Sequence, residues 1–132
     1  MRRKFDQIFL KDRNILRKIV ESANIKEGEK IIEIGPGKGF LTSYLLSRGA
    51  EVYAIEIDKN MIEFLKRNLS HPRLKLINED FLKLDFDKYF KGERLKLVAN
   101  IPYSITGKIL RRLMEIKNFF TKFILLYKKK LL

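Results

Sequence analysis

The sequence contains no cysteine and no tryptophan, and its single histidine is His71. The absence of cysteine excludes a disulfide-stabilised fold and any zinc or iron–sulfur site that needs thiolate ligands. His71 stands beside Pro72 with no second histidine to join it, so we predict no metal site. A chain without cysteine suits a reducing compartment, and we expect a cytoplasmic protein.

Long hydrophobic runs are also missing from the chain. The apolar stretch Phe123–Tyr127 is far shorter than the roughly 20 residues that a membrane-spanning helix needs. The first residues, Met1–Lys4, are basic as in a signal peptide, but Asp6 and Gln7 interrupt the segment that follows, so the apolar core of a signal peptide is absent. We therefore expect no membrane partner.

Acidic residues are the minority among the charges: 16 Asp and Glu stand against 29 Lys and Arg, which gives a formal net charge of +13. Such an excess predicts a polyanionic partner, with nucleic acid ahead of a membrane surface. Two basic clusters are candidates for binding phosphates: Arg2, Arg3, Lys4 and Lys11 near the N-terminus, and Lys108, Arg111 and Arg112 further along. The alternative is a set of solvated charges on a helix face or tail.

Apolar residues make up 45% of the 132 residues, which is enough for one buried core and predicts a single domain. Their spacing alternates between strand-like and helix-like segments. We expect strands at Lys30–Ile34, Glu51–Ile57, Leu74–Ile77, Arg94–Ala99 and Phe119–Tyr127. We expect helices that begin at Asp12, Phe40 and Asp58, and a further helix around Ile105–Ile116. Alternating strands and helices predict an α/β fold with a parallel, doubly wound sheet, whose ligands bind at the carboxyl ends of the strands.

A glycine-rich loop follows the first predicted strand. Gly35, Gly37 and Gly39 have the spacing G-x-G-x-G, which differs from the G-x-G-x-x-G of dinucleotide-binding proteins. Glycines permit a tight turn and let a ligand approach the backbone, and the next helix offers unpaired N–H groups. The alternative is a strand-to-helix turn with a purely structural role.

Acidic residues follow the next two strands. Glu56, 17 residues after Gly39, is placed to accept hydrogen bonds from ribose hydroxyls, unless it is a solvated charge or a partner of Lys59. Asp80 is suited to accept from an adenine amino group, and Phe81 can cover the base. Together with the glycine loop, these residues indicate an adenosine-containing cofactor, and the loop spacing favours S-adenosylmethionine over a dinucleotide.

The fourth strand leads into Asn100-Ile101-Pro102-Tyr103. Methylation of an aromatic exocyclic amine requires acceptors on its N–H groups, so that the nitrogen lone pair can point at the methyl donor. The side-chain carbonyl of Asn100 and the backbone carbonyl of Ile101 can supply them. Pro102 favours an extended Ile101, and Tyr103 offers a face on which an extruded base can stack. The alternative is a turn that ends a strand, with Tyr103 as a core aromatic residue.

Five segments in this order resemble one family closely: Phe5–Leu10, Glu33–Gly39, Ala54–Asp58, Asn78–Asp80 and Asn100–Tyr103. The chain resembles the ribosomal RNA adenine N6-dimethyltransferases of the KsgA type and their Erm-type antibiotic-resistance relatives, from about Lys4 to Tyr127. The resemblance implies a Rossmann-like, S-adenosylmethionine-dependent methyltransferase fold. It also implies transfer of two methyl groups to N6 of adenine in ribosomal RNA, with the small-subunit rRNA or an immature ribosomal subunit as the favoured partner.

The resemblance also assigns the site residues. The cofactor-binding residues are expected to be Leu10, Gly35, Gly37, Gly39, Glu56, Ile57, Asp80, Phe81 and Asn100. The catalytic, target-amine loop is expected to be Asn100, Ile101, Pro102 and Tyr103. Two N-terminal positions depart from the family pattern: Asp6 stands where glycine is usual, and Ile8 stands where asparagine or histidine is usual.

The family continues past the fifth strand with further strands and a helical C-terminal domain. We therefore expect residues 1–132 to be one incomplete catalytic domain, as a truncated or frameshifted copy would give. An unpaired sheet edge would then favour self-association. A catalytically silent RNA- or cofactor-binding fragment, an Erm-type enzyme acting on large-subunit rRNA, and a small-molecule methyltransferase are the alternatives. The Asn100–Tyr103 loop and the net charge weigh against the last.

Overall fold

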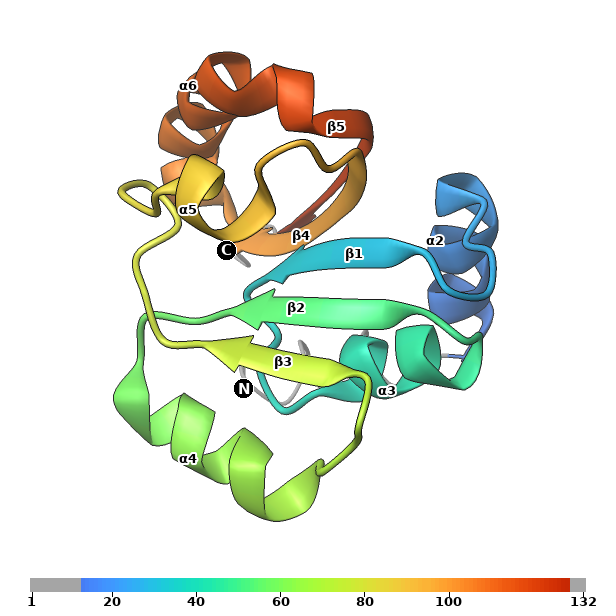
Figure 1. Ribbon diagram of the computed structural model, residues 1–132. Helices are drawn as coiled ribbons and strands as arrows, with labels where there is room; N and C mark the ends of the chain where they lie inside the picture. The colour runs from blue at the N-terminus through green and yellow to red at the C-terminus, as the bar shows by residue number, and fades with distance from the viewer. Residues whose placement is uncertain (1–12, 129–132) are drawn as a thin grey trace.

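The computed structural model describes residues 13–128 of the chain. A five-stranded sheet has the order β3-β2-β1-β4-β5, and every neighbouring pair of strands is parallel (Figure 1). The strands are β1 (Lys30–Ile34), β2 (Glu51–Ile55), β3 (Leu74–Ile77), β4 (Leu95–Pro102) and β5 (Phe120–Lys128). The strand order reverses between β1 and β4, and such a reversal opens a crevice at the carboxyl ends of the strands.

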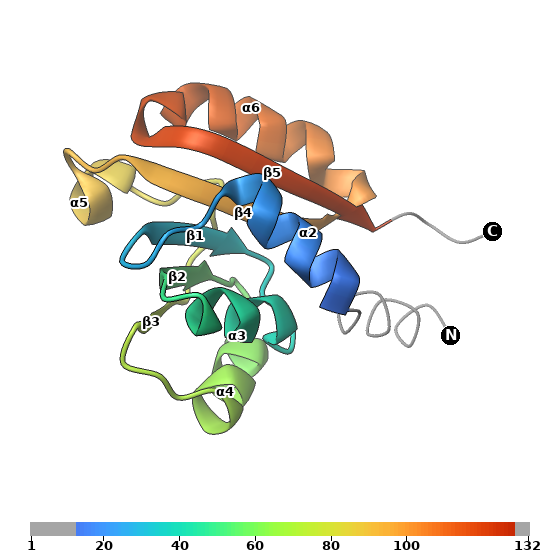
Figure 2. The ribbon, with the colours of Figure 1, turned by 90° about the vertical axis from the view of Figure 1, so that its right-hand side faces the viewer.

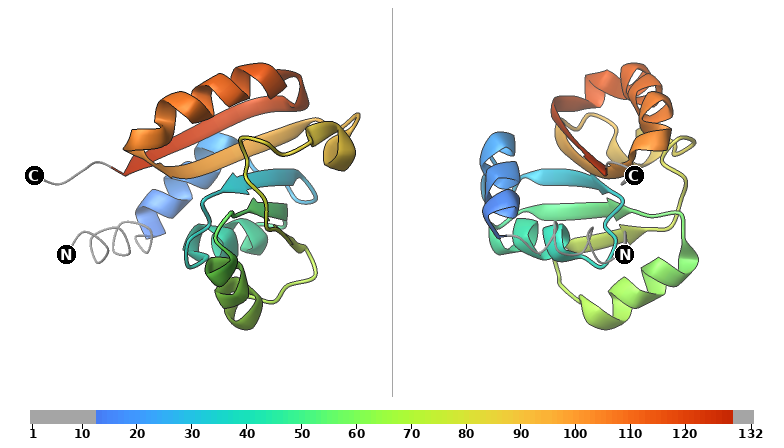
Figure 3. Two further views of the ribbon diagram at one scale, coloured as in Figure 1. Left: turned by 90° about the vertical axis from the view of Figure 1, so that its left-hand side faces the viewer. Right: turned by 180° about the vertical axis from the view of Figure 1, so that it is seen from behind.

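Helices cover both faces of the sheet. One face carries α2 (Arg13–Ala23), α3 (Phe40–Ser47) and α4 (Lys59–Asn68); the other carries α5 (Phe86–Phe90) and α6 (Thr106–Ile116). Figures 2 and 3 show α6 on the side of the sheet opposite α2 and α3. Two short 3-10 turns, η1 (Tyr103–Ile105) and η2 (Lys117–Phe119), flank α6. None of the helices within residues 13–128 is long and apolar enough to cross a bilayer.

Both faces of the central strands are buried, which explains their apolar composition. On β1, Ile31 packs against α2 and α3, whereas Ile32 and Ile34 point into the core beneath α5 and α6. Side chains alternate between the two faces of a strand, so Glu33 points to the same face as Ile31. A carboxyl group is thus buried in a layer whose other buried side chains are mostly apolar, Thr42 being an exception.

Lysines from two strands stabilise the C-terminal end of α2, a helix with no basic residue in its own last turn. The Nζ atom of Lys96 on β4 lies 2.7 Å from the carbonyl oxygen of Asn24, and Nζ of Lys122 on β5 lies 2.8 Å from that of Ser22. Cations are favourable here because the last carbonyls of a helix have no partner within it and carry partial negative charge. These lysines fix α2 against the sheet.

The sequence predicted the parallel α/β fold correctly, and β1 and β3 have the expected bounds. The other strand limits differ in ways that concern function. β2 ends at Ile55 rather than Ile57, so Glu56 and Ile57 lie in the loop beyond it. β4 was expected to end at Ala99, but it continues to Pro102 because β5 pairs with it along its whole length, with Asn100 opposite Leu126. The Asn100 segment is therefore held in a strand that extends past the end of β1.

The sequence pattern missed helix α5. Asp85 caps its N-terminus by accepting a hydrogen bond from the backbone N–H of Lys88 at 3.2 Å. The first and last residues of the helix, Phe86 and Phe90, are both buried and their rings pack 5.4 Å apart. A helix this short leaves no periodicity to detect, and the spacing of two phenylalanines behind a capping aspartate was the available signal.

The aromatic cluster around α5 predicts a large stability effect. Phe86→Ala removes a buried ring that contacts Phe81, Phe90, Phe119 and Phe120, and we expect a loss of about 3–5 kcal/mol in unfolding free energy. The matched control is Phe123→Ala. Phe123 keeps 38% of its surface exposed, so its replacement should lower the unfolding free energy much less. Urea denaturation of both variants measures the difference. Equal losses would contradict this account of the core.

Candidate active site

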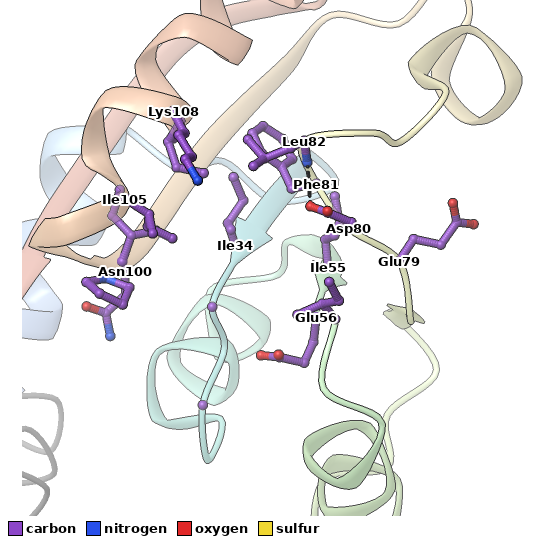
Figure 4. Close-up of a pocket in the computed structure, with 16 residues that line it drawn as sticks. Ile34, Ile55, Glu56, Glu79, Asp80, Phe81, Leu82, Asn100, Ile105 and Lys108 are labelled. Carbon is purple, nitrogen blue, oxygen red and sulfur yellow. Dashed lines mark hydrogen bonds between the residues drawn. The ribbon is translucent and has the colours of Figure 1, made fainter.

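A cavity of about 430 Å³ lies at the carboxyl edge of the sheet, where the strand order reverses. In Figure 4, Asn100, Ile105 and Lys108 line one side of it, and Glu56 and Asp80 lie across from them. Most of the predicted site residues line this cavity: Gly35, Gly37, Glu56, Ile57, Asp80, Phe81, Asn100, Ile101 and Pro102. The predicted cofactor and catalytic residues therefore meet in one place.

The cavity depends on a close approach between β1 and β4. Gly35 follows β1 with a φ of +73°, and a Cβ atom built on it would lie 2.4 Å from the backbone oxygen of Asn100. Any residue other than glycine would place its Cβ atom in a steric clash at that distance, and its backbone would be strained at that φ. Glycine is thus required at position 35 for the glycine loop and the end of β4 to form adjoining walls of the cavity.

Asn100 is 4% exposed, and its Oδ1 atom has no hydrogen-bond partner among the described residues. A buried amide oxygen without a partner costs about 1–3 kcal/mol of folding free energy. Asn100 is also one of the residues that line the cavity, so this acceptor without a partner belongs to a residue of the cavity wall. The amine-binding role of the Asn100 side chain stays a prediction.

The loop after β2 presents Glu56 and Ile57 to the cavity. Oε2 of Glu56 accepts a hydrogen bond from the backbone N–H of Asp58 at 2.9 Å, which fixes the carboxylate at the start of α4. Nδ2 of Asn78 donates to the carbonyl oxygens of Glu56 at 2.9 Å and Ile57 at 3.1 Å. Asn78 thereby ties this loop to the end of β3, a positioning role that the sequence pattern did not reveal. Ile57 keeps 67% of its surface exposed and gives the cavity an apolar rim.

Asp80 lies in a tight turn after β3. Its Oδ1 atom accepts from the backbone N–H of Leu82 at 2.9 Å, and its carbonyl oxygen accepts from that of Lys83 at 2.9 Å. Phe81 is 4% exposed and packs edge-on against Phe86, with ring centroids 5.8 Å apart. Phe81 therefore serves the core as well as the cavity wall, and its covering of a bound base stays a prediction.

Two of the predicted site residues that the structure describes, Gly39 and Tyr103, do not line the cavity. Gly39 has a φ of +88°, and its Cβ position lies 2.9 Å from a methyl carbon of Leu69, so glycine here allows α4 to pack closely. Tyr103 begins η1 and keeps 66% of its surface exposed, as a platform for an incoming base would require. Leu10 lies outside the described residues.

The second predicted basic cluster divides into two kinds of residue. Lys108 and Arg111 are exposed on α6, and Lys108 lines the cavity. Arg112 instead turns inward and donates from Nε to the carbonyl oxygen of Phe81 at 3.2 Å and from Nη2 to that of Leu84. The interpretation of Arg112 as a phosphate ligand is not supported, because its guanidinium is engaged by the protein's own backbone.

Glu33 is a buried titratable group directly before the glycine loop. It is fully buried, and its Oε1 atom accepts a hydrogen bond from Oγ1 of Thr42 at 2.5 Å. Burial raises the pKa of the Glu33 carboxyl to about 7, and the Thr42 hydroxyl opposes that shift. In the sequence, Glu33 stands out only as the first residue of the Glu33–Gly39 motif, because the burial of its carboxyl group cannot be read from the pattern.

The raised pKa of Glu33 predicts how stability depends on pH. Between pH 4.5 and about 7, the unfolded chain releases this proton while the folded chain keeps it, so stability falls as the pH rises through that window. Glu33→Gln cannot ionise and should lack this loss, which is about 3 kcal/mol at 1.36 kcal/mol per pKa unit. Denaturant unfolding of both proteins at pH 5 and pH 8 measures it. Parallel pH profiles would contradict the prediction.

Comparison with known proteins defines the class. The fold is similar to the crystal structures of the 23S rRNA methyltransferase ErmE and of a dimethyladenosine transferase from Plasmodium falciparum. Each has a TM-score of 0.69 and 32% sequence identity to this chain. The ErmE match covers 81% of this chain and 43% of that protein, and the Plasmodium match covers 87% of this chain and 40% of that protein. This is a Rossmann-like methyltransferase fold, which confirms the predicted fold class.

The family model for ribosomal RNA adenine dimethylase matches residues 1–131. The chain belongs to the ribosomal RNA adenine dimethylase family, and the predicted resemblance is confirmed.

Curated relatives support the same assignment. Ribosomal RNA small subunit methyltransferase A of Alkaliphilus oremlandii is 47% identical over 116 residues, which cover 84% of this chain and 40% of the relative. The protein of the same name from Mycoplasmopsis pulmonis is 43% identical over 128 residues, which cover 97% of this chain and 49% of the relative. The chain thus spans less than half the length of these relatives.

Proposed function

We propose that this chain is the catalytic domain of an rRNA adenine N6,N6-dimethyltransferase that acts in the cytoplasm on small-subunit rRNA. The observation that carries the proposal is the buried amide oxygen of Asn100, a cavity-lining residue, which has no hydrogen-bond partner among the described residues. An acceptor in that position suits an exocyclic amine, whose N–H groups need a partner when the base enters the site. The relatives named above favour the small-subunit rRNA.

The cavity residues fit S-adenosylmethionine, which supplies an electrophilic methyl group on its sulfonium. Gly35 and Gly37 line the wall without side chains that would occupy the space. Glu56 and Asp80 place carboxylates at the ends of β2 and β3, where the first can accept from ribose hydroxyls and the second from the adenine amino group. The apolar rim at Ile57 provides contact area for the adenine ring.

The target base is held by the Asn100–Tyr103 segment, on the side of the cavity opposite Glu56 and Asp80. Asn100 Oδ1 and the Ile101 carbonyl accept from the two N–H groups of the target amine, which directs the nitrogen lone pair toward the methyl group. The exposed ring of Tyr103 stacks on the extruded base. Positioning and preorganised acceptors supply the rate enhancement, and no strong general base is needed because the amine loses its proton after charge develops.

The net charge of +13 supports an RNA partner, and Lys108, which is exposed and lines the cavity, can contact phosphates. An immature small ribosomal subunit, in which the target adenines are accessible, is the substrate that we propose. Self-association through the sheet edge at β5 stays a prediction, which sedimentation at several protein concentrations tests.

Methyl transfer to separated rRNAs tests the proposal. We expect incorporation of labelled methyl groups from S-adenosylmethionine into adenines of unmethylated small-subunit rRNA or immature subunits. Asn100→Ala should reduce the rate by roughly 10²–10³-fold, because it removes an acceptor preorganised for the transition state. The matched control is Asn118→Ala, at an exposed position in η2.

The outcomes separate the alternatives. A folded protein that binds S-adenosylmethionine but methylates no rRNA would show a silent binding domain. Transfer only to large-subunit rRNA would indicate an Erm-type enzyme, and transfer to a small neutral acceptor without RNA would indicate a small-molecule methyltransferase.

A further inference from the structure

Arg112 on α6 makes an unusual set of contacts for an arginine in a surface helix. Its side chain is 16% exposed, and its Nε and Nη2 atoms donate to the carbonyl oxygens of Phe81 and Leu84. The guanidinium carbon lies 5.7 Å from the centroid of the Phe86 ring, and Nη1 is 3.2 Å from Oε1 of Glu115. Two donors on one edge of the planar group, Nε and Nη2, are therefore engaged by the loop that follows β3.

That loop carries Asp80. The turn is closed by hydrogen bonds from the backbone of Leu82 and Lys83 to Asp80, and the carbonyls of its Phe81 and Leu84 point to Arg112. A rigid, forked donor is suited to hold two backbone carbonyls at once, which a single ammonium cannot match in geometry. Arg112 thus fixes the turn from which the Asp80 carboxylate reaches the cavity.

Helix α6 connects this turn to the opposite wall. It begins at Thr106, directly after the Asn100–Tyr103 segment and η1, and its Ile109 packs into the core below the cavity. On the same helix, Arg112 lies roughly two turns after Thr106. One rigid element therefore sets the position of Asp80 relative to the segment that holds Asn100.

We infer that Arg112 is a positioning residue that holds Asp80 in place for recognition of the cofactor's adenine amino group. The inference rests on the proposed function, in which Asp80 accepts from that amino group. Arg112 does not touch the ligand; it acts through the Phe81 and Leu84 carbonyls. Its neighbour Arg111 is exposed and carries the same charge, so the two positions separate a positioning effect from a general effect of charge.

Calorimetric titration with two ligands tests the inference. The ligands are S-adenosylhomocysteine and its 6-deaminated analogue, in which hydrogen replaces the adenine amino group. The wild-type chain should prefer the adenine compound by roughly tenfold or more, since a hydrogen bond to a charged carboxylate is lost with the analogue. In Arg112→Met, the preference should fall close to one, mainly through weaker binding of the adenine compound.

Two further variants complete the design. Arg111→Met removes the same charge and should keep the wild-type preference. Arg112→Lys retains the charge and a donor but cannot form the fork, so it should keep part of the preference; it also carries the test if Arg112→Met fails to fold. All titrations are made well below the melting temperature of each variant.

Each result is decisive. A wild-type preference that survives in both Arg112 variants would overturn the inference, as would an equal loss of affinity for the two ligands, which indicates a merely structural role. A wild type that binds both ligands equally would overturn the role of Asp80 and this inference with it. A wild type that binds neither would overturn the proposed function itself.

Discussion

The approach of Gly35 to the backbone oxygen of Asn100 is the contact on which the site depends. It joins the carboxyl ends of β1 and β4, the two strands between which the order of the sheet reverses. The glycine loop and the Asn100 segment then become adjoining walls of a single cavity rather than two separate loops. Because β4 extends past β1 along its pairing with β5, Asn100 is held at this position by a regular strand.

The buried polar groups mark the part of the structure that lowers folding stability. Among the described residues, three polar or charged side chains are buried: Glu33, Thr42 and Asn100. Glu33 directly precedes the cavity-lining end of β1, Thr42 holds it from α3, and Asn100 lines the cavity from β4. Buried polar groups without full hydrogen bonding destabilise a domain, so their concentration around one end of two strands is best explained by ligand binding.

Much of the fold and site could be predicted from the sequence because both follow from local patterns. Strand periodicity gave the parallel sheet, and residues directly after parallel strands converge at one edge, which is why Glu56, Asp80 and Asn100 were identified. Contacts between distant segments could not be predicted in this way. The role of Gly39 depends on Leu69 of a later segment, and the inward turn of Arg112 depends on carbonyls about thirty residues earlier in the chain. Helix α5 was too short to show a period, and the extension of β4 required knowledge of its partner strand.

The most direct measurement of the central claim is the affinity of Gly35→Ala for S-adenosylhomocysteine, compared with Gly28→Ala. Both glycines have positive φ, so both substitutions strain the backbone, but a Cβ at Gly28 meets nothing within 4 Å. The account predicts that Gly35→Ala loses at least tenfold in affinity while the sheet stays folded, and that Gly28→Ala binds as the wild type does. Unchanged affinity in a folded Gly35→Ala protein would contradict it.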